Sequence, residues 1–94
     1  MEKTAHVYAL IGMVHGKQGR RGEALEALET ALRIDHGFVA AYLYRGNVHM
    51  GAGEFDQAVR DYARAAQLSP NDRNAMEALA KARAALSRQQ GKSN

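Results

Sequence analysis

The stretch "AYLYRGNVHMGAGEFDQAVRDYARAAQLSP", residues 41–70, carries the pattern that decides the fold. Its bulky and apolar residues recur at intervals of three and four, which is the spacing of one face of an α-helix. Gly53 interrupts this spacing where a tight turn needs a positive φ angle. The stretch therefore predicts two antiparallel helices, at residues 38–51 and 55–68, and Pro70 ends the second of them.

The same pattern occurs a second time upstream, displaced by one constant offset without a gap. We call this offset, which carries Tyr8 onto Tyr42, the repeat shift. Self-similarity at a fixed period is typical of repeat proteins. It predicts another pair of helices at residues 3–16 and 21–34, and a fifth helix at residues 73–88 continues the apolar spacing. The identical pairs under the repeat shift are Tyr8 with Tyr42, Gly12 with Gly46, Val14 with Val48, His15 with His49, Gly19 with Gly53, Ala24 with Ala58 and Ala31 with Ala65.

The composition limits the class of protein. A chain of 94 residues forms one small domain, and strand signals are nearly absent, so we expect an all-α fold. The lack of cysteine excludes disulfides and thiolate chemistry. The longest apolar run, "VYALIGMV", is far shorter than the span of about 20 residues that crosses a membrane. We therefore expect a cytoplasmic protein without membrane insertion.

These residues resemble the tetratricopeptide repeat family, in which helix–turn–helix units of about 34 residues stack into a superhelix. The large, small and turn positions of that family are filled by Tyr8, Gly12, Ala24, Ala31, Tyr42, Gly46, Ala58, Tyr62, Ala65 and Pro70. The resemblance implies a domain over residues 1–88, with repeats at 5–38 and 39–72, a capping helix at 73–88 and a disordered tail at 89–94.

Three departures from the family pattern matter. His36 stands where the resemblance implies a proline, and His15 and His49 stand where it implies a tyrosine. The third departure is an arginine. Arg45 stands where the resemblance implies a leucine in the first helix of the second repeat. A buried guanidinium without a partner would be too costly, so we expect its head to reach the helix edge or to pair with a carboxylate.

The resemblance also implies a function, because the family binds partner proteins in a concave groove lined by the first helix of each unit. Met13 and Met50 would give this groove adaptable apolar side chains, which suit a peptide or an amphipathic helix of a partner. Mapped position by position, the groove residues are His6, Ala9, Met13 and Lys17, then Ala40, Leu43, Asn47 and Met50, and finally Asn74, Glu77 and Lys81.

A subclass of the family uses a lysine–asparagine clamp to bind the C-terminal carboxylate of heat-shock chaperones. Asn47 matches that clamp, whereas Ala9 and Met13 stand at its first lysine and asparagine positions. Glu77 replaces a further lysine, and Lys81 fits the next basic position only in part. We therefore expect a more apolar ligand than a terminal carboxylate.

Enzymatic and metal chemistry find little support in the sequence. The stretch "GMVHGKQG", residues 12–19, lacks the spacing and the hydroxyl residue of a phosphate-binding loop. His15 and His49 occupy equivalent positions, but a structural zinc site needs four ligands and no others are evident. No serine belongs to a nucleophile motif. We expect a protein that is not an enzyme and has no cofactor or metal.

Two alternative functions stay open. The chain could be a homo-oligomerisation or scaffold unit, or a fragment of a longer repeat protein, because three or more repeats are usual. It could also be a basic accessory module that binds RNA, since Lys17, Arg20 and Arg21 cluster at one turn and Arg60 and Arg64 lie on one helix face. A net charge of +3 is mild for a dedicated nucleic-acid binder, so a protein partner is the main prediction.

Overall fold

The structure is a computed structural model that describes residues 2–92, with side chains for residues 3–91. It consists of five helices, and no strand occurs among the described residues. The prediction of an all-α fold made of helical hairpins is confirmed. The helices are α1 (Glu2–Lys17), α2 (Arg21–Ile34), α3 (Val39–Gly51), α4 (Phe55–Leu68) and α5 (Arg73–Lys92).

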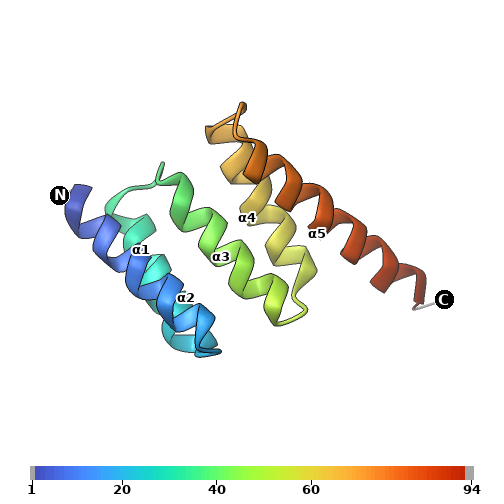
Figure 1. Cartoon of the computed structure of the whole chain (residues 1–94), viewed down its shortest axis with the longest axis horizontal. Coiled ribbons are helices and arrows are strands. Elements are labelled where there is room, and N and C mark those ends of the chain that lie inside the picture. The colour runs from blue at the N-terminus through green and yellow to red at the C-terminus, as the bar shows by residue number, and fades with distance from the viewer. Residues whose placement is uncertain (1, 93–94) are drawn as a thin grey trace.

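The helices form two hairpins and a final single helix, arranged side by side (Figure 1). Helix α1 packs on α2, α3 packs on α4, and α5 packs on α4. The two hairpins meet where α3 contacts both α2 and α1. The result is an elongated slab of 47 × 30 × 17 Å, in which each helix packs against its neighbours.

Two glycines shape the turns within the hairpins. Gly19 and Gly53 have φ angles of 76° and 75°, and they are the described residues with positive φ. A side chain at either position would strain the backbone, whereas glycine adopts this conformation freely. The matching turns explain why both hairpins close over the same number of residues.

Two other glycines bring the helices of each hairpin into contact. A Cβ atom on Gly12 would lie 2.5 Å from Cγ of Leu28, and one on Gly46 would lie 2.5 Å from Cε1 of Tyr62. Such distances are far below van der Waals contact, so only glycine permits this approach. The remaining signature residues Ala24, Ala31, Ala58 and Ala65 are fully buried, Tyr42 is half-buried, Tyr8 lies at an exposed edge of α1, and Pro70 is exposed after α4.

The start of α5 follows the prediction and its end does not. Oδ1 of Asp72 accepts hydrogen bonds from the backbone N–H groups of Asn74 and Ala75, at 2.9 and 3.3 Å, which caps the helix. The helix then continues to Lys92, beyond the expected end at residue 88. Residues 89–92 of the expected tail are therefore helical, and residues 93–94 lie outside the described residues.

Arg45 pairs with a carboxylate, as expected for a charged side chain at that position. Its Nε and Nη2 atoms donate to Oδ2 and Oδ1 of Asp61 on α4, at 2.9 and 2.8 Å. The hydrogen bond to Asp61 raises the pKa of Arg45 above its ordinary value, although burial acts in the opposite direction. This ion pair joins the two helices of the second hairpin at a position where the resemblance implies a leucine.

Glu54 connects the two hairpins. The Arg21 guanidinium at the start of α2 donates to Oε1 of Glu54 through Nε and Nη2, at 2.9 and 2.6 Å. His49 Nδ1 lies 2.9 Å from the same oxygen, and its Nε2 lies 3.7 Å from Oδ2 of Asp61. The bonds from Arg21 and then from His49 hold the pKa of Glu54 below its ordinary value of 4.5. Charged groups from three helices thus fix α3 between its neighbours.

Candidate protein-binding groove

Two pockets lie between the first helices of the hairpins and α5. The first has a volume of ≈360 Å³ and opens between α1 and α3, and the second has a volume of ≈350 Å³ and opens between α3 and α5. Asn47 lines both, and we call the two pockets together the groove. The first is lined by Met13, Gly16, Lys17, Tyr44, Asn47 and Val48, and the second by Asn47, Met50, Tyr62, Asn74, Glu77, Ala78 and Lys81.

Asn47 is held in one orientation at the centre of the groove. Its Oδ1 accepts a hydrogen bond of 2.5 Å from the Tyr62 hydroxyl, while the Asn47 side chain itself is exposed. Burial, followed by the charge of Asp61, raises the pKa of Tyr62 to about 12, so its hydroxyl stays a donor at neutral pH. The two N–H donors of the Asn47 amide are therefore left for a ligand.

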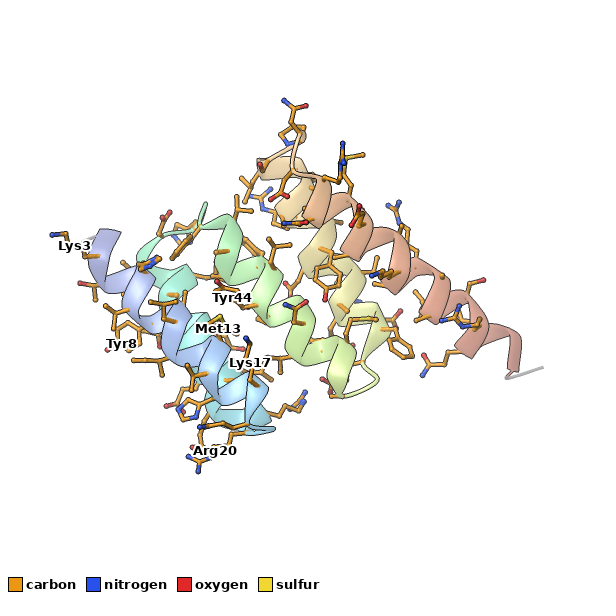
Figure 2. All side chains as sticks on the ribbon, viewed as in Figure 1. Lys3, Tyr8, Met13, Lys17, Arg20 and Tyr44 are labelled. Carbon is orange, nitrogen blue, oxygen red and sulfur yellow. The ribbon has the colours of Figure 1, made fainter. Side chains whose placement is uncertain are left out.

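The walls of the groove are apolar and its margins are charged. Met13 and Tyr44 face each other across the first pocket, and Figure 2 shows Met13 and Lys17 of α1 and Tyr44 of α3 on the facing sides of these helices. Lys17 and Lys81 are exposed, one in each pocket. The groove combines apolar walls, a central hydrogen-bond donor and one ammonium group in each pocket, and this arrangement is suited to binding.

Most of the groove residues expected from the sequence line the two pockets, and four of them, His6, Ala9, Ala40 and Leu43, do not. Met13, Lys17, Asn47, Met50, Glu77 and Lys81 line the two pockets, as does Asn74. Ala9 instead lies in the core and is 1% exposed, because the residue faces α2 and α3. Leu43 packs against a buried cluster that includes Tyr62 and Leu79, so it supports the groove from within.

Tyr44, Val48 and Tyr62 also line the groove, although they are not among the groove residues expected from the sequence. Tyr44 lies three residues before Asn47, and this helical spacing could have placed it on the same face. No local signal could have revealed Tyr62, because its hydroxyl reaches Asn47 from a different helix. His6, another expected residue, stacks on Phe38 beside a separate pocket, with ring centroids 5.9 Å apart.

The two equivalent histidines face carboxylates of their own hairpins. Nδ1 of His15 lies 3.9 Å from Oε2 of Glu23, and His49 lies between Glu54 and Asp61. Among the residues that the structure describes, no group of three or more His, Cys, Asp or Glu side chains is placed to hold a metal ion. In the same part of the chain, no helix is long and apolar enough to cross a membrane.

Comparison with known proteins agrees with this architecture. The chain is 37% identical to the DnaJ protein P58IPK homolog A of Oryza sativa subsp. japonica over 79 residues, which are 84% of this chain and 17% of that protein. It is 31% identical to DnaJ homolog subfamily C member 7 of Mus musculus over 67 residues, or 71% of this chain and 14% of that protein. The chain thus spans about a sixth of the length of these curated relatives.

The repeat itself is matched by a family model. Two overlapping segments, residues 10–73 and 43–91, match the model of the tetratricopeptide repeat, a type of repeat that generally serves protein–protein interaction. Together the segments cover residues 10–91, which run from the middle of α1 almost to the end of α5. Since the matched segments span most of the sequence and the helices recur under the repeat shift, the chain belongs to the tetratricopeptide repeat family.

Proposed function

We propose that the chain is a non-catalytic protein-interaction module, which binds an extended segment of a partner protein in the groove. The observation that supports this function best is the bond from Tyr62 to Oδ1 of Asn47, an exposed residue that lines both pockets and keeps its N–H donors for a ligand. A backbone carbonyl of an extended segment is free to accept this bond. The carbonyls inside a helix are already bonded within the helix, so they suit the donor less well.

The pockets on either side of Asn47 determine which side chains of the ligand fit. Met13, Tyr44 and Val48 form an apolar lining in the first pocket, which fits an aliphatic or aromatic side chain. In the second pocket, Met50 and Ala78 lie beside the charged groups of Glu77 and Lys81, so a polar side chain fits there. Met13 makes the α1 wall apolar, and this favours an internal segment of the partner over a terminal carboxylate.

The relatives suggest the setting in which the module acts. Both named relatives are DnaJ proteins, and the matched region is a small part of each. We propose that the chain serves as the protein-binding part of a DnaJ-type co-chaperone activity. In such a protein the groove would select the partner, because it holds hydrogen-bond donors and apolar walls in a fixed arrangement.

The methionine methyl groups of this chain provide a direct test. Peptides are selected from a random display library against the full chain, and the bound state is followed by NMR of the methionine methyl groups. We expect the signals of Met13 and Met50 to shift on binding, because these residues line the two pockets. The signal of Met76, which is exposed on α5 outside the groove lining, should stay in place.

A matched pair of variants separates binding from stability. Asn47→Asp keeps an oxygen that accepts the bond from Tyr62 and removes both N–H donors, so it should weaken peptide binding roughly tenfold with little loss of stability. Asn71→Asp, in the exposed turn before α5, is the control and should leave binding unchanged. Selected peptides that shift Met76 but not Met13 and Met50, or that bind the Asn47→Asp variant equally well, would contradict the proposal.

A further inference from the structure

A third pocket adjoins the first pocket of the groove, at the end of the molecule where both hairpin turns lie. It has a volume of ≈260 Å³, and we call it the turn pocket. Gly16, Asn47 and Val48 line both the turn pocket and the first pocket, so a bound segment can reach from one into the other. The remaining walls of the turn pocket are formed by Gly19, Arg21, Gly51 and Ala52.

The charged side chains that line these two pockets are basic. Arg21 lines the turn pocket and Lys17 lines the first pocket, and no acidic residue is among the described residues that line either. The second pocket of the groove differs, because both Glu77 and Lys81 line it. The separate pocket beside Phe38 likewise has one acidic and one basic side chain. The turn end of the groove therefore presents positive charge to a ligand.

Glu54 holds the guanidinium of Arg21 in place and leaves one of its nitrogens for a ligand. Nε and Nη2 of Arg21 donate to Oε1 of Glu54 at 2.9 and 2.6 Å, and Nη2 also donates to Oε2. Nη1, which carries two further N–H groups, has no acceptor among the described residues. A guanidinium that is fixed along one edge is a preorganised donor at its other edge.

Lys17 supplies a positive charge that no other described side chain offsets. The residue is exposed, and none of the ion pairs among the described residues includes it. Arg20 differs, since its Nη1 lies 3.8 Å from Oε2 of Glu23, and Figure 2 shows Arg20 at the tip of the first hairpin, beyond Lys17. Because Glu54 offsets Arg21, the charge of Lys17 remains uncompensated at this end of the groove.

We propose that the turn pocket binds the side-chain carboxylate of an aspartate or glutamate in the partner segment that the groove holds, an inference that rests on the proposed function. Lys17 provides the opposite charge, and Nη1 of Arg21 donates to the carboxylate. The N–H donors of Asn47 remain with the backbone of the segment. One carboxylate matches the charge of Lys17, whereas a phosphate carries nearly two negative charges and would be repelled more strongly by Glu54.

The positions of the two pockets define where the acidic residue stands in the segment. From the first pocket to the turn pocket, the lining on α3 moves from Tyr44, Asn47 and Val48 to Asn47, Val48, Gly51 and Ala52. This is a shift of about three residues, or roughly 5 Å along the helix. An extended segment advances about 3.3 Å per residue. The acidic residue therefore stands one or two positions from the residue whose apolar side chain enters the first pocket.

A synthetic peptide tests this inference. The peptide is the tightest binder selected from the display library, and both of its ends are blocked, so that each carboxylate belongs to a side chain. We expect it to carry an aspartate or glutamate next to its apolar anchor or one residue further away. Replacing that residue with asparagine or glutamine keeps its shape and removes the charge. Fluorescence anisotropy should show roughly tenfold weaker binding of this amide peptide to the original chain.

Two variants of neighbouring basic residues locate the effect. In Lys17→Gln the acidic and amide peptides should bind within about threefold of each other, because the main charge that distinguishes them is absent. Arg20→Gln removes the same charge three residues away, outside the lining of both pockets, and should keep the original difference between the peptides. Lys17 is exposed, so the thermal midpoint of Lys17→Gln should stay within about 2 °C of the original value.

Three results would overturn the inference while the proposed function stands. The first is a set of selected peptides that shift the Met13 and Met50 signals but carry no acidic residue. The second is a difference between the acidic and amide peptides that persists in full in Lys17→Gln. The third is tighter binding of a phosphoserine peptide than of the acidic peptide, because the pocket would then be a phosphate site. Selected peptides that leave the Met13 and Met50 signals in place would contradict both the proposed function and this inference.

Discussion

The guanidinium of Arg45 on α3 and the carboxylate of Asp61 on α4 form a two-point ion pair, with bonds of 2.9 and 2.8 Å, inside the second hairpin. The side chains are 24% and 7% exposed. The equivalent positions in the first hairpin, reached by the repeat shift, hold Ile11 and Ala27. Two hairpins of one fold therefore carry a charged pair at these two positions in one case and two apolar residues in the other.

This relationship predicts a strong coupling between the two positions. Arg45→Ile alone should lower the free energy of unfolding by about 2–4 kcal/mol, because it leaves the buried Asp61 carboxylate without its main partner. The double variant Arg45→Ile with Asp61→Ala installs the pair of the first hairpin and should lie within about 1 kcal/mol of the original chain. Urea unfolding of the single and double variants measures the coupling. If the double variant loses as much free energy of unfolding as the two single variants together, the prediction that two apolar residues can replace the ion pair is refuted.

The close approach of α3 and α4 predicts opposite effects for two glycines on α3. Gly46→Ala should destabilise the fold by about 1–3 kcal/mol, because its Cβ would meet the Tyr62 ring, which the bond to Asn47 holds in place. Gly51→Ala should raise stability by up to about 1 kcal/mol, since no atom lies within 4 Å of its Cβ position and alanine favours the helix. Chemical unfolding compares the two variants, and effects of the same sign would count against this account of the hairpin contact.

The lowered pKa of Glu54 predicts a loss of stability in acid. Above the ordinary value of 4.5 the carboxyl is ionised in the folded and unfolded chains, and its bonds to Arg21 and His49 contribute in full. Below that value the unfolded chain binds the proton first, so the contribution is lost as the pH falls through the lowered pKa of the folded state. The urea midpoint of Glu54→Gln should therefore lie below that of the original chain at about pH 5.5. At about pH 3 the difference between the two midpoints should be much smaller.

A matched control is available on α2 for the acid experiment. Glu26 is an exposed glutamate, and Glu26→Gln should shift the urea midpoint by a similar small amount at both pH values. A difference between the original chain and Glu54→Gln that stays constant from about pH 5.5 to about pH 3 would rule out the carboxylate of Glu54 as the source.

The raised pKa of Tyr62 predicts a loss of stability at alkaline pH. Its ordinary pKa is 10.0 and the folded state raises it to about 12, so the stabilisation is complete below pH 10.0 and is lost as the pH rises through about 12. Ultraviolet titration should show a late phenolate step that Tyr62→Phe removes and Tyr8→Phe leaves in place. Tyr62→Phe should also cost about 1 kcal/mol at neutral pH, through loss of the bond to Asn47. If the late phenolate step persists in Tyr62→Phe, its assignment to Tyr62 is wrong.

The repeat and its helices were predictable from the sequence because their causes are local. The turn at Gly53 depends on a φ angle that glycine adopts, and the start of α5 depends on a cap that Asp72 supplies three residues before Ala75. The end of α5 was predicted less well. Residues 89 and 90 are both glutamine, which favours a helix, and the helix passes through Gly91 to Lys92.

The groove was predictable only in part. The resemblance to the repeat family implied that Met13, Lys17 and Asn47 share one groove, and Met13 and Lys17 lie on one face of α1 because they are four residues apart. The same spacing could not show that Ala9 and Leu43 would be covered, because this depends on how closely the neighbouring helices approach. Nor could it reveal Tyr62, whose contact with Asn47 joins two helices.

By itself, the sequence determined the hairpin repeat, the turns and the residues that allow close helix contact, because periodic burial and backbone preference act over a few residues. The tertiary structure decided which carboxylate pairs with Arg45, which way the Asn47 amide faces and which pocket Arg21 lines. These properties depend on distances between helices, and such distances are fixed only when side chains from separate segments pack together.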